Sequence, residues 1–180
     1  MRNRIFLGLT MMALLSGCAA DLSSGKKFTG FQTPPADKSL VYFLRDESVM
    51  ATKLPYIYVN ATTPDAKGEP AGKFNLTAVV GKDMFVPVLM DPGTYLFIAG
   101  TKDVVTIKPN EVKCIEVGGK FRGITVFVVE PMEKADCEKV LAGKDEGVQV
   151  LEALKRTGQL KTPLQPAAVP TKVSEAKPGA

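Results

Sequence analysis

The sequence predicts an all-β fold: an antiparallel sandwich of about seven or eight strands, with one or two C-terminal helices packed on it. Three observations lead to this prediction. Short apolar or alternating runs recur at regular intervals between residues 39 and 129, turn residues separate these runs, and a helix-forming composition is confined to the stretch after Glu130. Regularly spaced short strands with intervening turn signals are typical of sandwiches and barrels.

The predicted strands follow one another at residues 40–44, 56–59, 73–80, 84–90, 95–99, 104–107, 112–117 and 124–129. Pro87 interrupts the fourth run and indicates a sheet edge or a bulge, because proline has no N–H to donate. Asp91-Pro92-Gly93-Thr94 fits a type II turn, so we expect a hairpin that returns through residues 95–99. Gly118-Gly119 is expected to form a further turn.

Two helices are expected after the strands. Pro131 suits a first helical position, and residues 132–142 are rich in Glu, Lys, Ala and Leu before Gly143. Asp145 is placed to cap a second helix that ends at Gly158. Within it, Val148, Leu151 and Leu154 recur on one side, and Glu152 and Arg156 form a favourable i,i+4 pair.

The first residues have the layout of an export signal. Arg2 and Arg4 precede an apolar run over residues 5–15 that is too short to span a membrane as a helix. The sequence Leu15-Ser16-Gly17-Cys18 resembles the lipobox of bacterial lipoproteins. That resemblance implies cleavage before Cys18, a diacylglycerol on its thiol and an acyl chain on its amino group. The alternative is an ordinary secretory signal followed by a coincidental cysteine. By resemblance to enterobacterial sorting, Ala19 favours the outer membrane.

The chain is therefore expected to comprise four segments: a lipoprotein signal peptide at 1–17, a lipidated tether at 18–38, a sandwich domain with its helices at 39–158, and a disordered Pro/Ala/Lys tail at 159–180. Phe28 and Phe31 are the exceptions in the tether and are candidates to fold back onto the domain. Removal of residues 1–17 leaves 21 basic and 19 acidic residues. This nearly neutral balance gives no reason to expect nucleic acid as a partner.

With Cys18 assigned to lipid, Cys114 and Cys137 remain as an even pair in an oxidising compartment, where a disulfide between them is the natural expectation. Two separate buried thiols are the alternative. No metal site is expected, because the chain has no histidine and the two thiols do not match a zinc spacing.

Four short motifs carry a family resemblance: Ser39-Leu-Val-Tyr-Phe-Leu-Arg45, Pro55-Tyr-Ile-Tyr-Val-Asn60, Gly72-Lys-Phe74 and Asp91-Pro-Gly-Thr-Tyr95. Together they resemble the bacterial lipoprotein family called domain of unknown function 2846, over roughly residues 38–130. The chain departs from that family by a longer insertion at 61–71, which leaves the register of the second and third strands open. The resemblance implies a membrane-attached sandwich of the fibronectin or transthyretin kind and no particular activity.

The sequence gives little support for a catalytic site. The absence of histidine excludes Ser-His-Asp and Cys-His catalysis. The two overlapping Ser-x-x-Lys matches at residues 23–27 lie in the expected tether rather than at the start of a buried helix. We therefore expect no enzymatic activity and no cofactor.

Three residues are candidates for binding. Tyr56 and Tyr58 share a strand face and could stack on sugar rings, although aromatic residues also favour half-buried strand faces for structural reasons. Arg45 could pair with a carboxylate of a partner or of peptidoglycan, or mark the point where its strand emerges into solvent.

Two functions follow as expectations. The first is an outer-membrane lipoprotein, facing the periplasm or alternatively the cell surface, that acts as a non-enzymatic protein-binding or scaffolding module, for example as an accessory of a secretion or motility complex. An open sheet edge that accepts an added strand would serve such a role. The second is a periplasmic lipoprotein that binds a small ligand or a glycan such as peptidoglycan, which requires a concave site with convergent polar groups.

Overall fold

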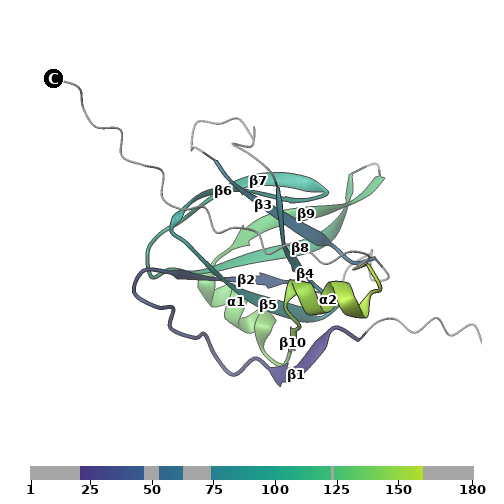
Figure 1. The fold of residues 1–180 in the computed structure, drawn as a ribbon, viewed down its shortest axis with the longest axis horizontal. Helices are drawn as coiled ribbons and strands as arrows, with labels where there is room; N and C mark the ends of the chain where they lie inside the picture. The colour runs from purple at the N-terminus through teal and green to yellow at the C-terminus, as the bar shows by residue number, and fades with distance from the viewer. Residues whose placement is uncertain (1–20, 47–52, 63–73, 123, 160–180) are drawn as a thin grey trace, which may run out of the picture.

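The computed structural model describes residues 21–46, 53–62, 74–122 and 124–159, in which ten strands form two sheets packed face to face (Figure 1). The predicted β-sandwich is confirmed. Cys18, the expected signal peptide, residues 160–180 of the expected tail and most of the 61–71 insertion lie outside the described residues. No helix in the described ranges has the length and apolar character needed to span a membrane.

The larger sheet has six strands in the order β1-β10-β5-β2-β8-β9. Their bounds are Ser23–Lys27 (β1), Asp145–Gly147 (β10), Met84–Met90 (β5), Ser39–Leu44 (β2), Val112–Arg122 (β8) and Ile124–Met132 (β9). Neighbouring strands run antiparallel except in two pairs, β10 with β5 and β2 with β8, which are parallel. The sheet is therefore mixed, although most of its pairing is antiparallel.

The smaller sheet has four antiparallel strands in the order β4-β3-β6-β7. Their bounds are Asn75–Val79 (β4), Tyr56–Ala61 (β3), Gly93–Ala99 (β6) and Thr101–Ile107 (β7). A bulge between Ile57 and Tyr58 shifts the register of β3 against β4, the pair of strands that the insertion joins.

Two of the predicted turns are wrong. The Asp91-Pro92 connection does not close a hairpin, because β5 pairs with β2 in one sheet whereas β6 pairs with β3 and β7 in the other. Gly118 and Gly119 lie inside β8, opposite Val128 and Phe127 of β9. In both places the local residues are compatible with a turn, but pairing with strands that are distant in the sequence determines the backbone conformation.

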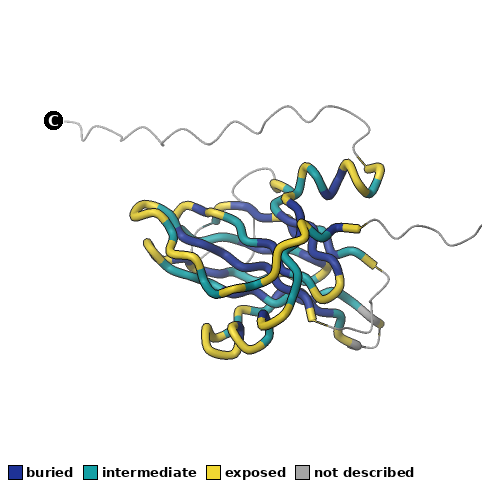
Figure 2. The backbone as a smooth tube through the Cα atoms, turned by 90° about the horizontal axis from the view of Figure 1, so that it is seen from below, coloured by how far each residue is buried: buried dark blue, intermediate teal, exposed yellow. Residues whose placement is uncertain are grey.

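The main core lies between the two sheets. Side chains that alternate inward along the strands interlock there, among them Val41, Phe43, Ile57, Val59 and Phe97, all nearly or completely buried. Figure 2 shows buried backbone running along the strands, with exposed residues concentrated at their ends and in the connections. Burial of this apolar surface supplies the main favourable free energy of the fold.

Helix α1 (Lys134–Leu141) covers the outer face of the six-stranded sheet. The bond between Cys114 of β8 and Cys137 of α1 joins helix and sheet, with Cα atoms 6.2 Å apart, so the predicted disulfide is confirmed. The predicted helix start is wrong: Pro131 belongs to β9, opposite Ile115, and the helix begins after Glu133. Proline has no backbone N–H to donate, and an edge strand such as β9 tolerates this loss.

Helix α2 (Val150–Arg156) packs over one end of the four-stranded sheet, where Ala153 and Val148 join Val79 and Leu22 in a separate apolar cluster. The expected Glu152–Arg156 ion pair forms at 3.0 Å. Asp145 does not cap the helix, contrary to the prediction, because it begins β10 and Gln149 occupies the N-cap position.

The expected tether is part of the domain from Leu22 onward. Leu22 is 2% exposed, and residues 23–27 form β1, which pairs with β10. Residues 28–38, here called the strap, then run toward β2 (Figure 1). The Phe28 and Phe31 rings pack edge-on against Tyr42, as the sequence had suggested for these two residues. The tether prediction fails for residues 23–27 because their partners lie more than 100 residues away in β10, where no local pattern reveals them. It fails for the strap because Phe28 and Phe31 pack on Tyr42 of β2.

Candidate functional site

Arg45, a predicted binding residue, does not reach solvent. Its side chain is 0% exposed at the end of β2, where Nη1 donates a 2.7 Å hydrogen bond to the Lys53 carbonyl oxygen and the guanidinium stacks over the Phe127 ring. Burial lowers the pKa of Arg45, and the nearby Asp83 carboxylate acts in the opposite direction. The prediction that Arg45 marks an exit into solvent or meets an outside carboxylate is therefore wrong, and its role is structural.

The two tyrosines of β3 have different surroundings. Tyr56 is half-buried against the α2 cluster around Val79 and Ala153, whereas Tyr58 is 39% exposed. A paired stacking platform is therefore not formed, and Tyr58 alone remains accessible.

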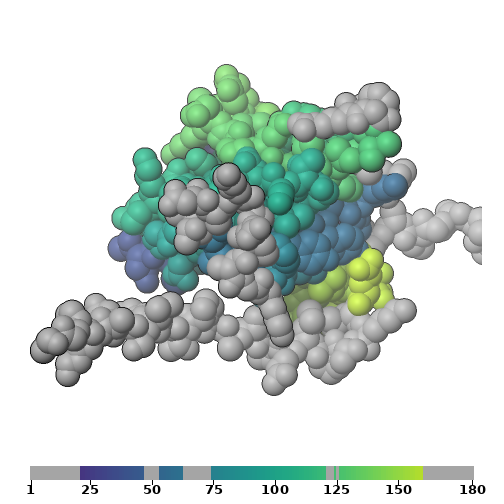
Figure 3. Space-filling view, turned by 90° about the horizontal axis from the view of Figure 1, so that it is seen from above, coloured from purple at the N-terminus to yellow at the C-terminus, as the bar shows by residue number. Residues whose placement is uncertain are grey.

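Tyr58 lies on an apolar stretch of the outer face of the four-stranded sheet. In the sheet register Tyr58 stands opposite Leu76 of β4 and Ile98 of β6. Ile98 in turn pairs with the exposed Lys102 of β7, and Val104 lies two residues further along β7 on the same face. Leu76, Ile98 and Val104 are half-buried. We call these three residues and Tyr58 the Tyr58 face. In Figure 3 the blue and teal strands of this sheet lie between the green β8–β9 hairpin and the yellow-green helix α2.

The edge strand β1 is poorly suited to accept an added strand. The N–H groups of Ser23 and Gly25 already donate to side-chain oxygens, and Arg156 Nη1 donates to the Asp21 and Ser23 carbonyl oxygens at 3.0 Å each. Occupied backbone groups blunt an edge against pairing with another chain. At the opposite edge, Pro131 of β9 has no N–H to offer.

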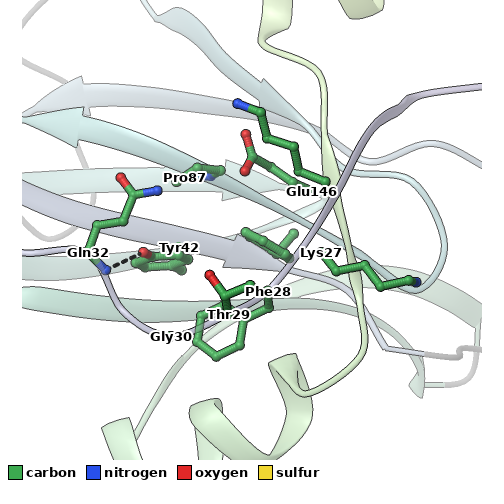
Figure 4. A pocket seen from close by; sticks show the side chains of 10 residues that line it. Lys27, Phe28, Thr29, Gly30, Gln32, Tyr42, Pro87 and Glu146 are labelled. Atoms are coloured by element: carbon green, nitrogen blue, oxygen red, sulfur yellow. Dashed lines mark hydrogen bonds between the residues drawn. The ribbon is translucent and has the colours of Figure 1, made fainter.

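A pocket of about 330 Å³ opens on the outer face of the six-stranded sheet (Figure 4). We call it the strap pocket. It lies between the strap and strands β1, β10 and β5, where the three-residue strand β10 ends and leaves part of β5 uncovered. Its lining consists of Lys26, Lys27, Phe28, Thr29, Gly30, Gln32, Tyr42, Phe85, Pro87 and Glu146.

The strand register determines where the polar side chains of the strap pocket lie. Glu146 stands beside Phe85 in the β10–β5 register, and Tyr42 stands beside Pro87 in the β2–β5 register, so both side chains rise from the same sheet face. The Gln32 N–H donates a 3.1 Å hydrogen bond to the Tyr42 hydroxyl oxygen, drawn as a dashed line in Figure 4. Burial raises the pKa of Tyr42; the hydrogen bond from the Gln32 N–H acts in the opposite direction, and the nearby Glu146 carboxylate adds a smaller increase. The hydroxyl is thus held as a hydrogen-bond donor at neutral pH.

Sequence reasoning missed this pocket. Gln32 and Tyr42 lie more than 100 residues from Glu146, and only the clustering of Phe28 and Phe31 in an otherwise polar stretch hints that the strap packs on the sheet. The described ranges contain no group of three or more Cys, Asp or Glu side chains placed to hold a metal ion.

Comparison with protein-family models, with curated proteins and with solved structures gives no match for this chain. The resemblance to the domain of unknown function 2846 family therefore stays a prediction.

Proposed function

We propose that the chain is a lipoprotein of the bacterial cell envelope, anchored in the outer membrane through Cys18, whose sandwich domain is a non-enzymatic protein-binding or scaffolding module. The observation that supports the binding role is the Tyr58 face. It offers a partly exposed aromatic ring beside Leu76, Ile98 and Val104 on the outside of a sheet. Aromatic anchors among aliphatic neighbours are the usual energetic centres of protein interfaces.

This surface favours packing over strand addition as the mode of binding. Backbone groups at the β1 edge are already hydrogen-bonded within the domain. The Tyr58 face, by contrast, can bind a partner through side-chain packing alone, without backbone hydrogen bonds. We therefore propose a partner protein that lays an apolar surface on the four-stranded sheet.

The anchor part of the proposal has a geometric consequence. Because Leu22 is buried in the domain, only four peptide units separate its Cα from that of Cys18. Such a stretch spans at most about 14 Å. A lipid on Cys18 would hold the β1 side of the domain against the membrane surface, with the Tyr58 face on a different side of the sandwich (Figure 1).

The anchor is tested by metabolic labelling with an alkyne analogue of palmitate. The wild-type chain should take up label and pellet with membranes, and Cys18→Ala should lose both properties. A labelled Cys18→Ala variant, or an unlabelled wild-type chain, would contradict the assignment.

The binding role is tested by photocrosslinking in intact cells. A photoreactive phenylalanine analogue at position 58 should give one crosslinked envelope protein. The same analogue at Lys139, an exposed position of α1 on the other outer face, is the matched control. Equal products from both positions would contradict a specific interface on the Tyr58 face.

A further inference from the structure

Two side chains of opposite charge line the strap pocket without contributing an ion pair to the fold. Glu146 and Lys26 both line it, and among the described residues neither side chain forms an ion pair or a hydrogen bond. Lys27, by contrast, is committed to Asp145 at 2.8 Å. Most other charges around β10 are paired in the same way; Lys144, for example, bonds Asp46 at 2.8 Å.

Tyr42 adds a buried hydrogen-bond donor to this pair of charges. Its side chain is 1% exposed, and its oxygen already accepts the Gln32 N–H, so the hydroxyl hydrogen needs an acceptor. The described residues provide none. A buried donor without an acceptor is unfavourable, and a ligand or ordered water in the pocket would satisfy it.

We propose that the strap pocket binds a small zwitterion that carries a primary ammonium group and an anionic phosphate or carboxylate group. The ammonium group donates to the Glu146 carboxylate. The anionic group accepts from the Tyr42 hydroxyl and the Lys26 ammonium. The Phe28 ring and Pro87 line the pocket beside the short carbon linker of such a ligand.

The charge pattern selects this class over neutral or singly charged ligands. A neutral sugar brings no charge to either group, and a simple anion or cation pairs with one of them and is repelled by the other. A quaternary ammonium group has no N–H to donate to Glu146 and is recognised instead by cages of aromatic rings. The volume of about 330 Å³ is at the lower end for small-molecule sites and suits a headgroup-sized molecule.

Phosphoethanolamine has this chemistry, either as a free molecule or as the headgroup of a phospholipid. The proposed anchor at Cys18 would favour the lipid source, because the short connection to Leu22 would hold the β1 side of the domain, and with it the strap pocket, near the membrane surface. Binding of the free zwitterion does not depend on the anchor.

The test uses the mature chain from residue 18 with Cys18→Ser, titrated calorimetrically with O-phosphoethanolamine. We expect saturable binding that weakens at least about tenfold in Glu146→Gln, because a charge-assisted hydrogen bond is lost. Glu138→Gln, which removes an exposed carboxylate of α1, is the matched control and should bind as the parent does. Thermal melts should show that both variants remain folded.

Further titrations separate the alternatives. Weaker binding of O-phosphocholine, together with flotation on phosphatidylethanolamine vesicles but not on phosphatidylcholine vesicles, would support a lipid headgroup. Binding of O-phosphoethanolamine without flotation would support the free zwitterion. Absence of binding at millimolar concentration, equal binding of O-phosphocholine, or unchanged affinity in Glu146→Gln would overturn the proposal. None of these results depends on lipidation of Cys18 or on the Tyr58 face.

Discussion

Replacement of Phe28 by alanine tests whether the strap is part of the folded domain. The Phe28 ring lies 5.3 Å from Phe31, 6.1 Å from Tyr42 and 5.6 Å from Phe85, measured between ring centroids, and all three pairs meet edge-on. Removing a half-buried ring exposes on the order of 100 Å² of apolar surface, worth about 2.5 kcal/mol, and loss of the edge-on pairs adds up to about 1 kcal/mol. Phe28→Ala should therefore lower the free energy of unfolding by about 2 to 3.5 kcal/mol.

The assay is equilibrium urea unfolding followed by circular dichroism, with Thr29→Ala, at an exposed strap position, as the control. For a chain of this size the loss corresponds to a fall in the urea midpoint of about 1 to 2 M at unchanged slope. The control should stay within about 0.5 kcal/mol of the parent, as is usual for surface substitutions. If Phe28→Ala also stays within that range, the strap behaves as a tether and its packing contributes no stability.

Three further predictions concern stability. Replacing Cys114 and Cys137 together by alanine opens a loop with a sequence separation of 23 and should cost about 3.5 kcal/mol in the chain-entropy model, seen as a lower melting temperature than that of the oxidised parent. Burial raises the pKa of Glu116, so its protonated form favours folding and the penalty grows as pH rises from 4.5 through the folded-state pKa. Glu116→Gln should therefore stabilise the protein near neutral pH and lose that advantage at about pH 4 in paired melts; the same gain at both values would refute the burial effect. Gly100 has φ +96°, and a Cβ there would lie 2.7 Å from the Phe127 carbonyl oxygen, so Gly100→Ala should cost about 2 to 4 kcal/mol in urea unfolding. Gly143→Ala, with positive φ but open space, should cost only about 1 kcal/mol.

The sandwich could be predicted because its central strands carry their own signal. Residues 39–44 and 56–61 combine apolar, β-branched and aromatic side chains in short runs. Such runs are stable as strands because their side chains become buried between two sheets. The disulfide was predicted from the number of cysteines and the expected oxidising compartment, neither of which requires knowledge of the fold.

The strap, β10 and the strap pocket could not be predicted because each depends on distant contacts. β1 and β10 read Ser-Ser-Gly-Lys-Lys and Asp-Glu-Gly, which have no apolar alternation, and they become strands only by pairing with each other and, for β10, with β5. Arg45 shows the same limit. A charge at the end of a strand usually reaches water, but here the Lys53 carbonyl and the Phe127 ring enclose it.

The binding role of the Tyr58 face is tested most directly by the crosslinking yield from position 58 in cells that also carry Ile98→Glu. Ile98 stands opposite Tyr58 in the sheet, so a carboxylate there places a charge in the centre of the proposed interface, with Lys102 of β7 as its other cross-strand neighbour. We predict that the crosslinked product falls at least about tenfold while the purified variant stays folded, with a melting temperature only a few degrees lower because Ile98 is half-buried rather than part of the core. An undiminished product in a folded Ile98→Glu variant would contradict binding through this face.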